Sequence, residues 1–360
     1  MSSGVSNSQL DSGALPGLPL QVRGKTLLIM MLSVPLCLLA AAVDHYLLNG
    51  LIHDYSVAHP IQVVWWVAIL STPHIIASIV TFADAEYLRH YKRPLARAVI
   101  VGTLLGVGLP LLAGFLLMPM NQPPTLSALL SYGGNAALVV AAAYTTYHNL
   151  QQQYGISLML MREKPVFIHH LWKWITIVPA SLIFIGMNFL HLGQPYQIWE
   201  RCMAVAAVNL LIAAIIAGII IHRYLKRPDR SDIGLAYFCA NGLMIVSCLF
   251  LAMKGYILFA MLTPRLVHDL TAYWIYMVHD ENRNANRMRN PFYALPKKIG
   301  IGPAITCIPL SFVIGFILLE VGQTAFLIGF FVVMLNYIHY YIEGIIWKRG
   351  TPHRQHVPFV

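Results

Sequence analysis

The chain has 360 residues, of which 58% are hydrophobic and only 11% are charged, and its mean hydropathy is +0.65. Soluble domains carry about 25% charged residues, so this composition excludes an ordinary soluble protein and indicates a polytopic membrane protein. The net charge of +10 does not indicate a nucleic-acid partner, because the basic residues follow the loops of a membrane topology.

The N-terminal residues 1–25 are rich in Ser and Gly, which predicts a short disordered cytoplasmic tail. The rest of the chain is a series of apolar runs, each close to the roughly 20 residues that cross a bilayer. The fold predicted is an all-α, polytopic membrane helix bundle with about ten transmembrane helices, in one domain over 26–347 with a cytoplasmic tail over 348–360. The predicted spans are 26–48, 61–88, 97–118, 126–150, 167–190, 202–222, 233–253, 256–280, 300–320 and 323–347.

The distribution of Lys and Arg predicts the orientation of these spans. With the N-terminus inside, 21 of the 24 basic residues fall in inside segments, and only Arg201 and Lys254 fall in outside loops. Cytoplasmic loops are enriched in Lys and Arg, so the sequence predicts that both termini are inside (N-in and C-in). The five cysteines lie singly in apolar runs without CxxC spacing, which indicates neither a disulfide framework nor a thiolate metal site.

Ionisable residues at membrane depth gather in four of the predicted spans, the second, fourth, eighth and tenth. At a rise of about 1.5 Å per residue, His74, His268 and His339 lie about 18–24 Å from the outer end of their spans, and other members lie deeper. All four spans run from outside to inside, so these groups meet in the cytoplasmic half of the bundle. The predicted metal ligands are His74, His148, His268, His279, His339, Glu343, Glu86 and His90.

Helical spacing refines this set. His339 and Glu343 are i,i+4, as are Glu86 and His90, so each pair shares a helix face. His268 and His279 share a face but lie about 16 Å apart along the axis, which places them at two levels of the site.

The acidic neighbours of two histidines have a predicted supporting role. Asp269 and Asp280 each follow a histidine directly, and in a regular helix each points about 100° away from that histidine. We therefore expect each carboxylate to orient a ring on another helix. His353 and His356, in the C-terminal tail, are expected to be solvated.

The nitrogen and carboxylate donors favour iron, in a di-iron pair, with zinc, manganese and copper as alternatives. Arg265, Tyr276 and Asp269 are the predicted catalytic residues. Tyr276 would donate a proton, while Arg265 would either contact a substrate anion or neutralise Asp269. A histidine bonded to a helix carbonyl is the structural alternative for any one ring.

At these motifs the chain resembles the membrane-integral, histidine-rich non-haem iron enzymes, which include lipid desaturases, hydroxylases and bacterial carotene-cleaving dioxygenases. It lacks the HxxxH and HxxHH boxes of the desaturases, and His169-His170 is an isolated pair. The resemblance implies a membrane-embedded oxidoreductase (oxygenase, hydroxylase or desaturase) acting on a lipophilic substrate. We place it in the bacterial inner membrane. Any reductant would be a separate electron-donor protein, since the chain has no Gly-rich nucleotide loop.

Three other functions are compatible with the sequence. Intramembrane His, Asp and Arg also form proton relays, as in a proton-coupled transporter. His74 and His268 lie at similar depth and could be the axial ligands of haem b. A lipid-modifying transferase could use a His-Asp pair as a base. Metal content and a Soret band distinguish these functions.

Overall fold

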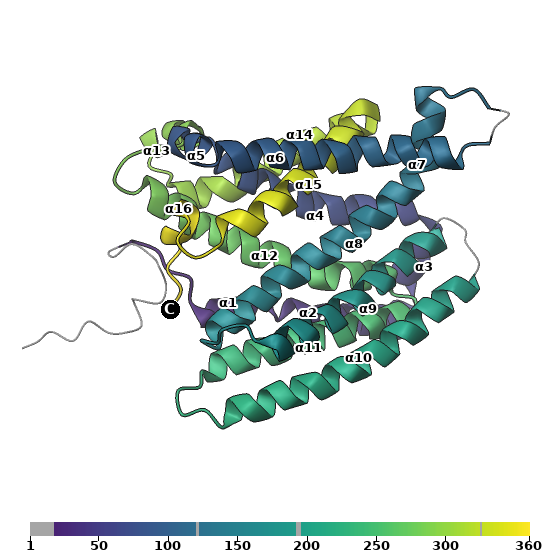
Figure 1. Ribbon diagram of the computed structural model, residues 1–360, viewed down its shortest axis with the longest axis horizontal. Coiled ribbons are helices and arrows are strands. Elements are labelled where there is room, and N and C mark those ends of the chain that lie inside the picture. The colour runs from purple at the N-terminus through teal and green to yellow at the C-terminus, as the bar shows by residue number, and fades with distance from the viewer. Residues whose placement is uncertain (1–17, 120–121, 192–195, 325) are drawn as a thin grey trace, which may run out of the picture. The chain divides into compact units, whose positions relative to one another are not determined.

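The structure is a computed structural model that describes residues 18–119, 122–191, 196–324 and 326–360 (Figure 1). Within these ranges the chain is helical and forms no sheet, and one isolated parallel β-bridge joins Val22 to Phe359. The all-α prediction is therefore confirmed. The first 17 residues of the predicted disordered tail lie outside the described residues.

The chain divides into two compact units. Unit 1 comprises residues 1–23, 68–137 and 271–360, and unit 2 comprises residues 24–67 and 138–270. Three helices contribute residues to both units, and these three carry His74, His148 and His268. They are α4 (Pro60–Val80), α8 (Leu126–Leu160) and α12 (Ile257–Asn284).

Unit 1 is built around the contact of α6 with α15, which Figure 1 shows in blue and yellow. An apolar cluster that includes Ile76, Tyr276 and Cys307 packs α4, α12 and α14 together. The helices that belong to this unit alone are α5 (Ala85–His90), α6 (Lys92–Thr103), the π-helix η1 (Leu104–Gly108), α7 (Leu109–Leu117), the 3-10 helix η2 (Pro291–Tyr293), α13 (Ala294–Lys298), α14 (Pro303–Thr324), α15 (Phe326–Ile346) and α16 (Pro352–Gln355).

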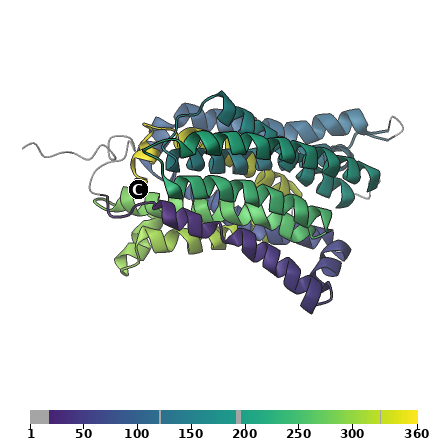
Figure 2. The same cartoon turned by 90° about the horizontal axis from the view of Figure 1, so that it is seen from below.

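Unit 2 is built around the antiparallel neighbours α9 and α10, with α1 and α2 packed along α11 (Figure 2). Trp172, Ile220 and Phe238 belong to its buried apolar cluster. The helices of this unit alone are α1 (Gly24–Met30), α2 (Ser33–Leu47), α3 (Leu51–Ala58), α9 (Phe167–His191), α10 (Tyr196–Leu225) and α11 (Asp232–Met253).

Six helical segments among the described residues are long and apolar enough to cross a membrane, and a bent pair within α8 makes up to seven. Each overlaps a predicted span. α12 is not among the six, since Arg265, His268 and Asp269 lower its hydropathy. Several apolar helices therefore support a membrane protein, while the count of ten spans and the N-in, C-in orientation stay predictions.

Two glycines allow the close approach of α15 that positions its histidine. A Cβ on Gly106 would lie 3.0 Å from the Cα of Met334, and one on Gly102 would lie 2.7 Å from the Ile338 side chain. A main-chain atom cannot move aside as a flexible side chain can. The α6–η1 segment therefore needs glycine where it crosses α15.

We expect Gly106→Ala to destabilise unit 1 by about 1–3 kcal/mol, the usual cost of overpacking. Gly108→Ala is the matched control in the same π-helical turn, because a Cβ there would meet only the Leu104 side chain at 3.8 Å and a carbonyl at 4.0 Å. Thermal unfolding in detergent measures both variants. Equal unfolding temperatures for the two would contradict the packing argument.

The C-terminal residues fold back onto unit 1. The Val22 N–H donates to Pro358 O at 2.8 Å, and the Asn282 amide donates to the carbonyls of Leu20 and His356. His353 and His356 are consequently buried, so the expectation that they are solvated is wrong. Burial of the ring, reinforced by nearby His279 and Arg283, lowers the pKa of His356 to about 4.

This pKa shift predicts a pH dependence. The usual histidine pKa is about 6.5, so between pH 6.5 and 4 the released segment binds a proton that the docked segment does not. Docking is therefore fully stable above pH 6.5 and weakens as the pH falls toward 4. Carboxypeptidase digestion of the tail should be slow at pH 7.5 and faster at pH 5. His356→Asn keeps a donor for Pro352 O but does not titrate, so it should reduce this difference in digestion rate. Equal wild-type digestion rates at both pH values would refute the predicted pH dependence.

Candidate metal centre

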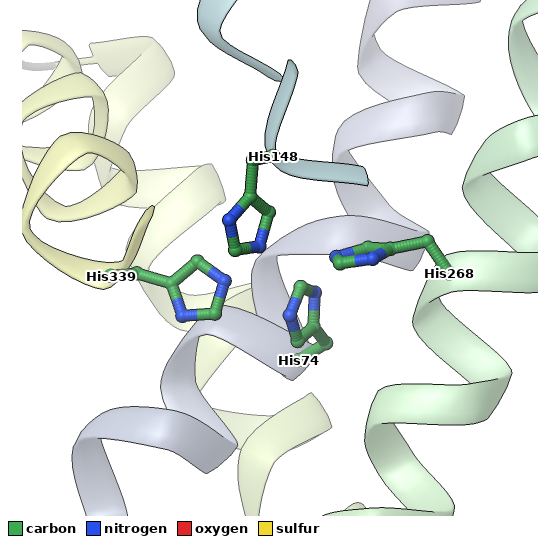
Figure 3. A group of neighbouring side chains, drawn as sticks. All are labelled: His74, His148, His268 and His339. Atoms are coloured by element: carbon green, nitrogen blue, oxygen red, sulfur yellow. The ribbon is translucent and has the colours of Figure 1, made fainter. Parts of the chain in front are cut away.

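Two buried histidines of unit 1 pack against each other. His74 belongs to α4 and His339 to α15, and their ring centroids lie 4.4 Å apart with the ring planes at 83° (Figure 3). Both rings are at most 1% exposed. Pro73 directly precedes His74 inside α4. A proline inside a helix removes one backbone hydrogen bond, which loosens the turn beside the ring.

A hydrogen bond indicates the tautomer of His339. The Ser78 hydroxyl donates to Ile75 O at 2.6 Å and lies 2.7 Å from Nδ1 of His339. Since a carbonyl can only accept, the Ser78 proton is used on Ile75, and Nδ1 of His339 carries the hydrogen of the second bond. Nε2 then presents its lone pair, as a metal-ligating imidazole requires.

A carboxylate lies on the Nε2 side of the same ring. Oε2 of Glu343 is 3.8 Å from Nε2 of His339, as the i,i+4 spacing predicts. The Tyr276 hydroxyl donates a hydrogen bond to Oε1 of Glu343. The Glu343 carboxylate is therefore oriented by Tyr276, one of the predicted catalytic residues.

Unit 2 contains a second pair of buried histidine rings. His148 belongs to α8 and His268 to α12, with ring centroids 5.0 Å apart and ring planes at 79° (Figure 3). Pro264 lies one turn before His268 inside α12. Arg265 and Asp269, the remaining predicted catalytic residues, are buried in this part of α12.

The histidines of the two pairs, His74, His148, His268 and His339, are the group of side chains among the described residues that could hold a metal ion. All four offer imidazole nitrogens as donors and all are buried. All four were predicted as ligands from the depth of their spans. A buried His-rich site with metal-binding potential is therefore present.

Two other predicted ligands, Glu86 and His90, lie in α5. The Glu86 carboxylate forms ion pairs with Arg283 and Arg289. His90 is exposed, with its ring against Tyr91. Their roles as metal ligands stay predictions.

His279 belongs to a hydrogen-bonded network near the C-terminal segment. Its Nδ1 lies 2.8 Å from Asp280 and its Nε2 lies 2.9 Å from the Tyr87 hydroxyl. The expectation that Asp280 orients a ring on another helix is wrong, because Nδ1 is close enough to the main chain for the adjacent carboxylate to reach it. The role of His279 as a metal ligand stays a prediction.

Two functional features were missed by sequence reasoning. Ser78 is four residues after His74 on α4, so a small polar residue one turn from a buried histidine is a usable signal for it. His353, whose ring stacks at 4.0 Å on Tyr87 and at 4.8 Å on His279, gave no local signal.

No family model, curated protein or solved structure matches the chain. Function is therefore argued from the chemistry of the site alone.

Proposed function

We propose that the protein is a membrane-embedded, iron-dependent oxidoreductase (oxygenase, hydroxylase or desaturase) that acts on a lipophilic substrate. The observation that carries the proposal is the set of four buried histidines, His74, His148, His268 and His339. Imidazole nitrogen is a preferred ligand of iron, copper and zinc, and the four rings offer donors of this one type inside the protein.

We infer that a single ion is bound by both histidine pairs. Four buried imidazoles supply as many nitrogen donors as one tetrahedral ion takes.

Glu343 would add an oxygen donor on the His339 side. Two atoms that bind one ion at about 2.1 Å each can be separated by up to about 4.2 Å, and Oε2 lies 3.8 Å from Nε2 of His339. Tyr276 would hold this carboxylate through Oε1 and could deliver a proton to it. This arrangement makes Glu343 and Tyr276 the groups that move protons beside the ion.

Nitrogen-rich sites with a carboxylate suit iron, which when bound would supply the oxidative chemistry. The apolar helices support a lipophilic substrate that reaches the site from the bilayer. We further propose a location in the bacterial inner membrane and a separate electron-donor protein where the reaction requires reductant. The same donor set would accept zinc, manganese or copper, so metal identity is part of the test.

Ring packing favours this proposal over haem b. His74 packs on His339, and His268 packs on His148, at centroid distances of 4.4 and 5.0 Å. An axial haem ligand needs open space beside its ring for the porphyrin, and a second imidazole packed against the ring reduces that space. If no metal binds, a proton relay is the alternative function that we would adopt.

Metal analysis tests the proposal. Protein produced with iron and purified without chelators should hold about one iron per chain and show no Soret band. His339→Ala and His268→Ala should each lose most of the iron while still inserting. His222→Ala, which removes an exposed histidine, is the matched control and should keep it. Wild-type protein without stoichiometric metal, or full occupancy in both ligand variants, would overturn the proposal, and two irons per chain would restore the di-iron prediction.

Ser78→Ala tests the tautomer argument separately. Loss of the acceptor for Nδ1 of His339 should weaken metal affinity by about 10–100-fold, the usual effect of removing a group that orients a ligand. Thr306→Ala is a control, because Thr306 bonds only within its own helix end, to Gly302 O. Competition with a chelator measures both. Unchanged affinity in Ser78→Ala would show that Ser78 does not set the ring.

A further inference from the structure

A lysine of unit 2 is buried without an acidic partner. Lys173 belongs to α9 and is only 9% exposed. Its Nζ donates a hydrogen bond to Oε1 of Gln151 at 3.0 Å, and in the part of the chain that the structure describes no carboxylate forms an ion pair with it. Lysines are almost never buried unless they are paired with an opposite charge. The ammonium therefore lacks the counter-charge that its position requires.

Aromatic rings flank this ammonium. Nζ of Lys173 lies 4.8 Å from the ring centroid of Trp174 and 5.6 Å from that of Tyr154. The face of an aromatic ring attracts a positive charge, so both rings favour the charged form of the lysine. One neutral amide and two rings reduce the cost of the buried charge, but they supply no negative charge. The site is therefore complementary to an anion.

Lys173 lies at the border between the core and the surface of unit 2. His170 and Trp174 are about 60° and 100° from it round α9, on the same side, and both are exposed. A lysine that extends into the head-group layer of a membrane keeps its ammonium outside the protein. Lys226 is exposed in this way, whereas Lys173 is covered. An anionic group would reach Nζ of Lys173 from the side of His170 and Trp174.

The same side of α9 continues as an apolar surface. Trp174 is 49% exposed, and Val178, one turn further along the helix, is 46% exposed. Both lie in a helical segment that is long and apolar enough to cross a membrane, so this surface suits an acyl chain. A ligand with an anionic head and a hydrocarbon chain would match both the ammonium and the surface beside it.

Contacts between α8 and α9 place this site near one of the four histidines. Gln151 accepts the hydrogen bond from Lys173, and Tyr147 stacks on Trp174 with ring centroids 5.6 Å apart. His148 lies between Tyr147 and Gln151 in α8, about 4.5 Å along the helix axis from Gln151. A chain that runs from Lys173 along α9 past Trp174 therefore passes at the level of His148.

We propose that Lys173 binds the anionic head group, a phosphate or a carboxylate, of a lipid or fatty acid whose chain lies along Trp174 and Val178. The ammonium supplies charge-assisted hydrogen bonds to the head-group oxygens, which are stronger than bonds between neutral groups. The binding itself does not depend on the proposed function. The statement that this amphiphile is the substrate class of the histidine site rests on the proposed function.

Quenching of tryptophan fluorescence by brominated lipids tests the inference, because Trp174 lies beside Lys173. The full-length protein in phosphatidylcholine vesicles should bind dibrominated phosphatidylglycerol or dibromostearate about tenfold more tightly than dibrominated phosphatidylcholine, or by about 1.4 kcal/mol. Preference for the first probe identifies a phosphate head group, and preference for the second identifies a carboxylate. Trp174→Phe keeps a ring against Tyr147 and should remove most of the selective quenching.

Lys173→Gln should abolish the preference for anionic probes, while its amide can still donate to Gln151. Lys226→Gln is the matched control, because it removes the same charge from an exposed residue of the same unit, and it should keep the preference. Equal binding of all three probes by the wild type would overturn the inference. An unchanged preference in Lys173→Gln, or selective quenching that persists in Trp174→Phe, would do the same.

Iron analysis of the same samples separates this inference from the proposed function. Preference for anionic probes in protein that never binds iron would retain the anion site and reject the oxidoreductase. Iron binding without this preference would reject the anion site alone.

Discussion

The cost of burying imidazole nitrogens in an apolar helical protein governs the architecture of the site. Each ring has two nitrogens, and each nitrogen must meet a donor or an acceptor. Around His339 the fold uses Ser78 for Nδ1 and directs Nε2 toward Glu343. Around His279 it uses Asp280 for one nitrogen and Tyr87 for the other. The first arrangement places a carboxylate beside the ring nitrogen that would bind an ion, whereas the second surrounds the ring with hydrogen-bonding protein groups.

That difference separates the His339 side of the proposed metal site from the hydrogen-bonded network around His279 in the same unit. The network of His279, Asp280 and Tyr87 continues through Tyr293, which donates to the same carboxylate of Asp280, and through the stacked ring of His353. It joins α12 to the loops and to the C-terminal segment. Its hydrogen bonds hold the C-terminal part of α12 against α5 and the segment around Tyr293.

Which features can be predicted from the sequence depends on how far apart in the chain the interacting residues lie. Helical spacing alone places Glu343 beside His339, and the position of each histidine within its span puts the four residues of the two pairs among the eight predicted ligands. Interactions between distant segments give no such periodic signal. The burial of His353 depends on a bridge between Val22 and Phe359 at opposite ends of the chain, and no local pattern near residue 353 reports it. The bond from Ser78 to His339 likewise depends on how α4 meets α15.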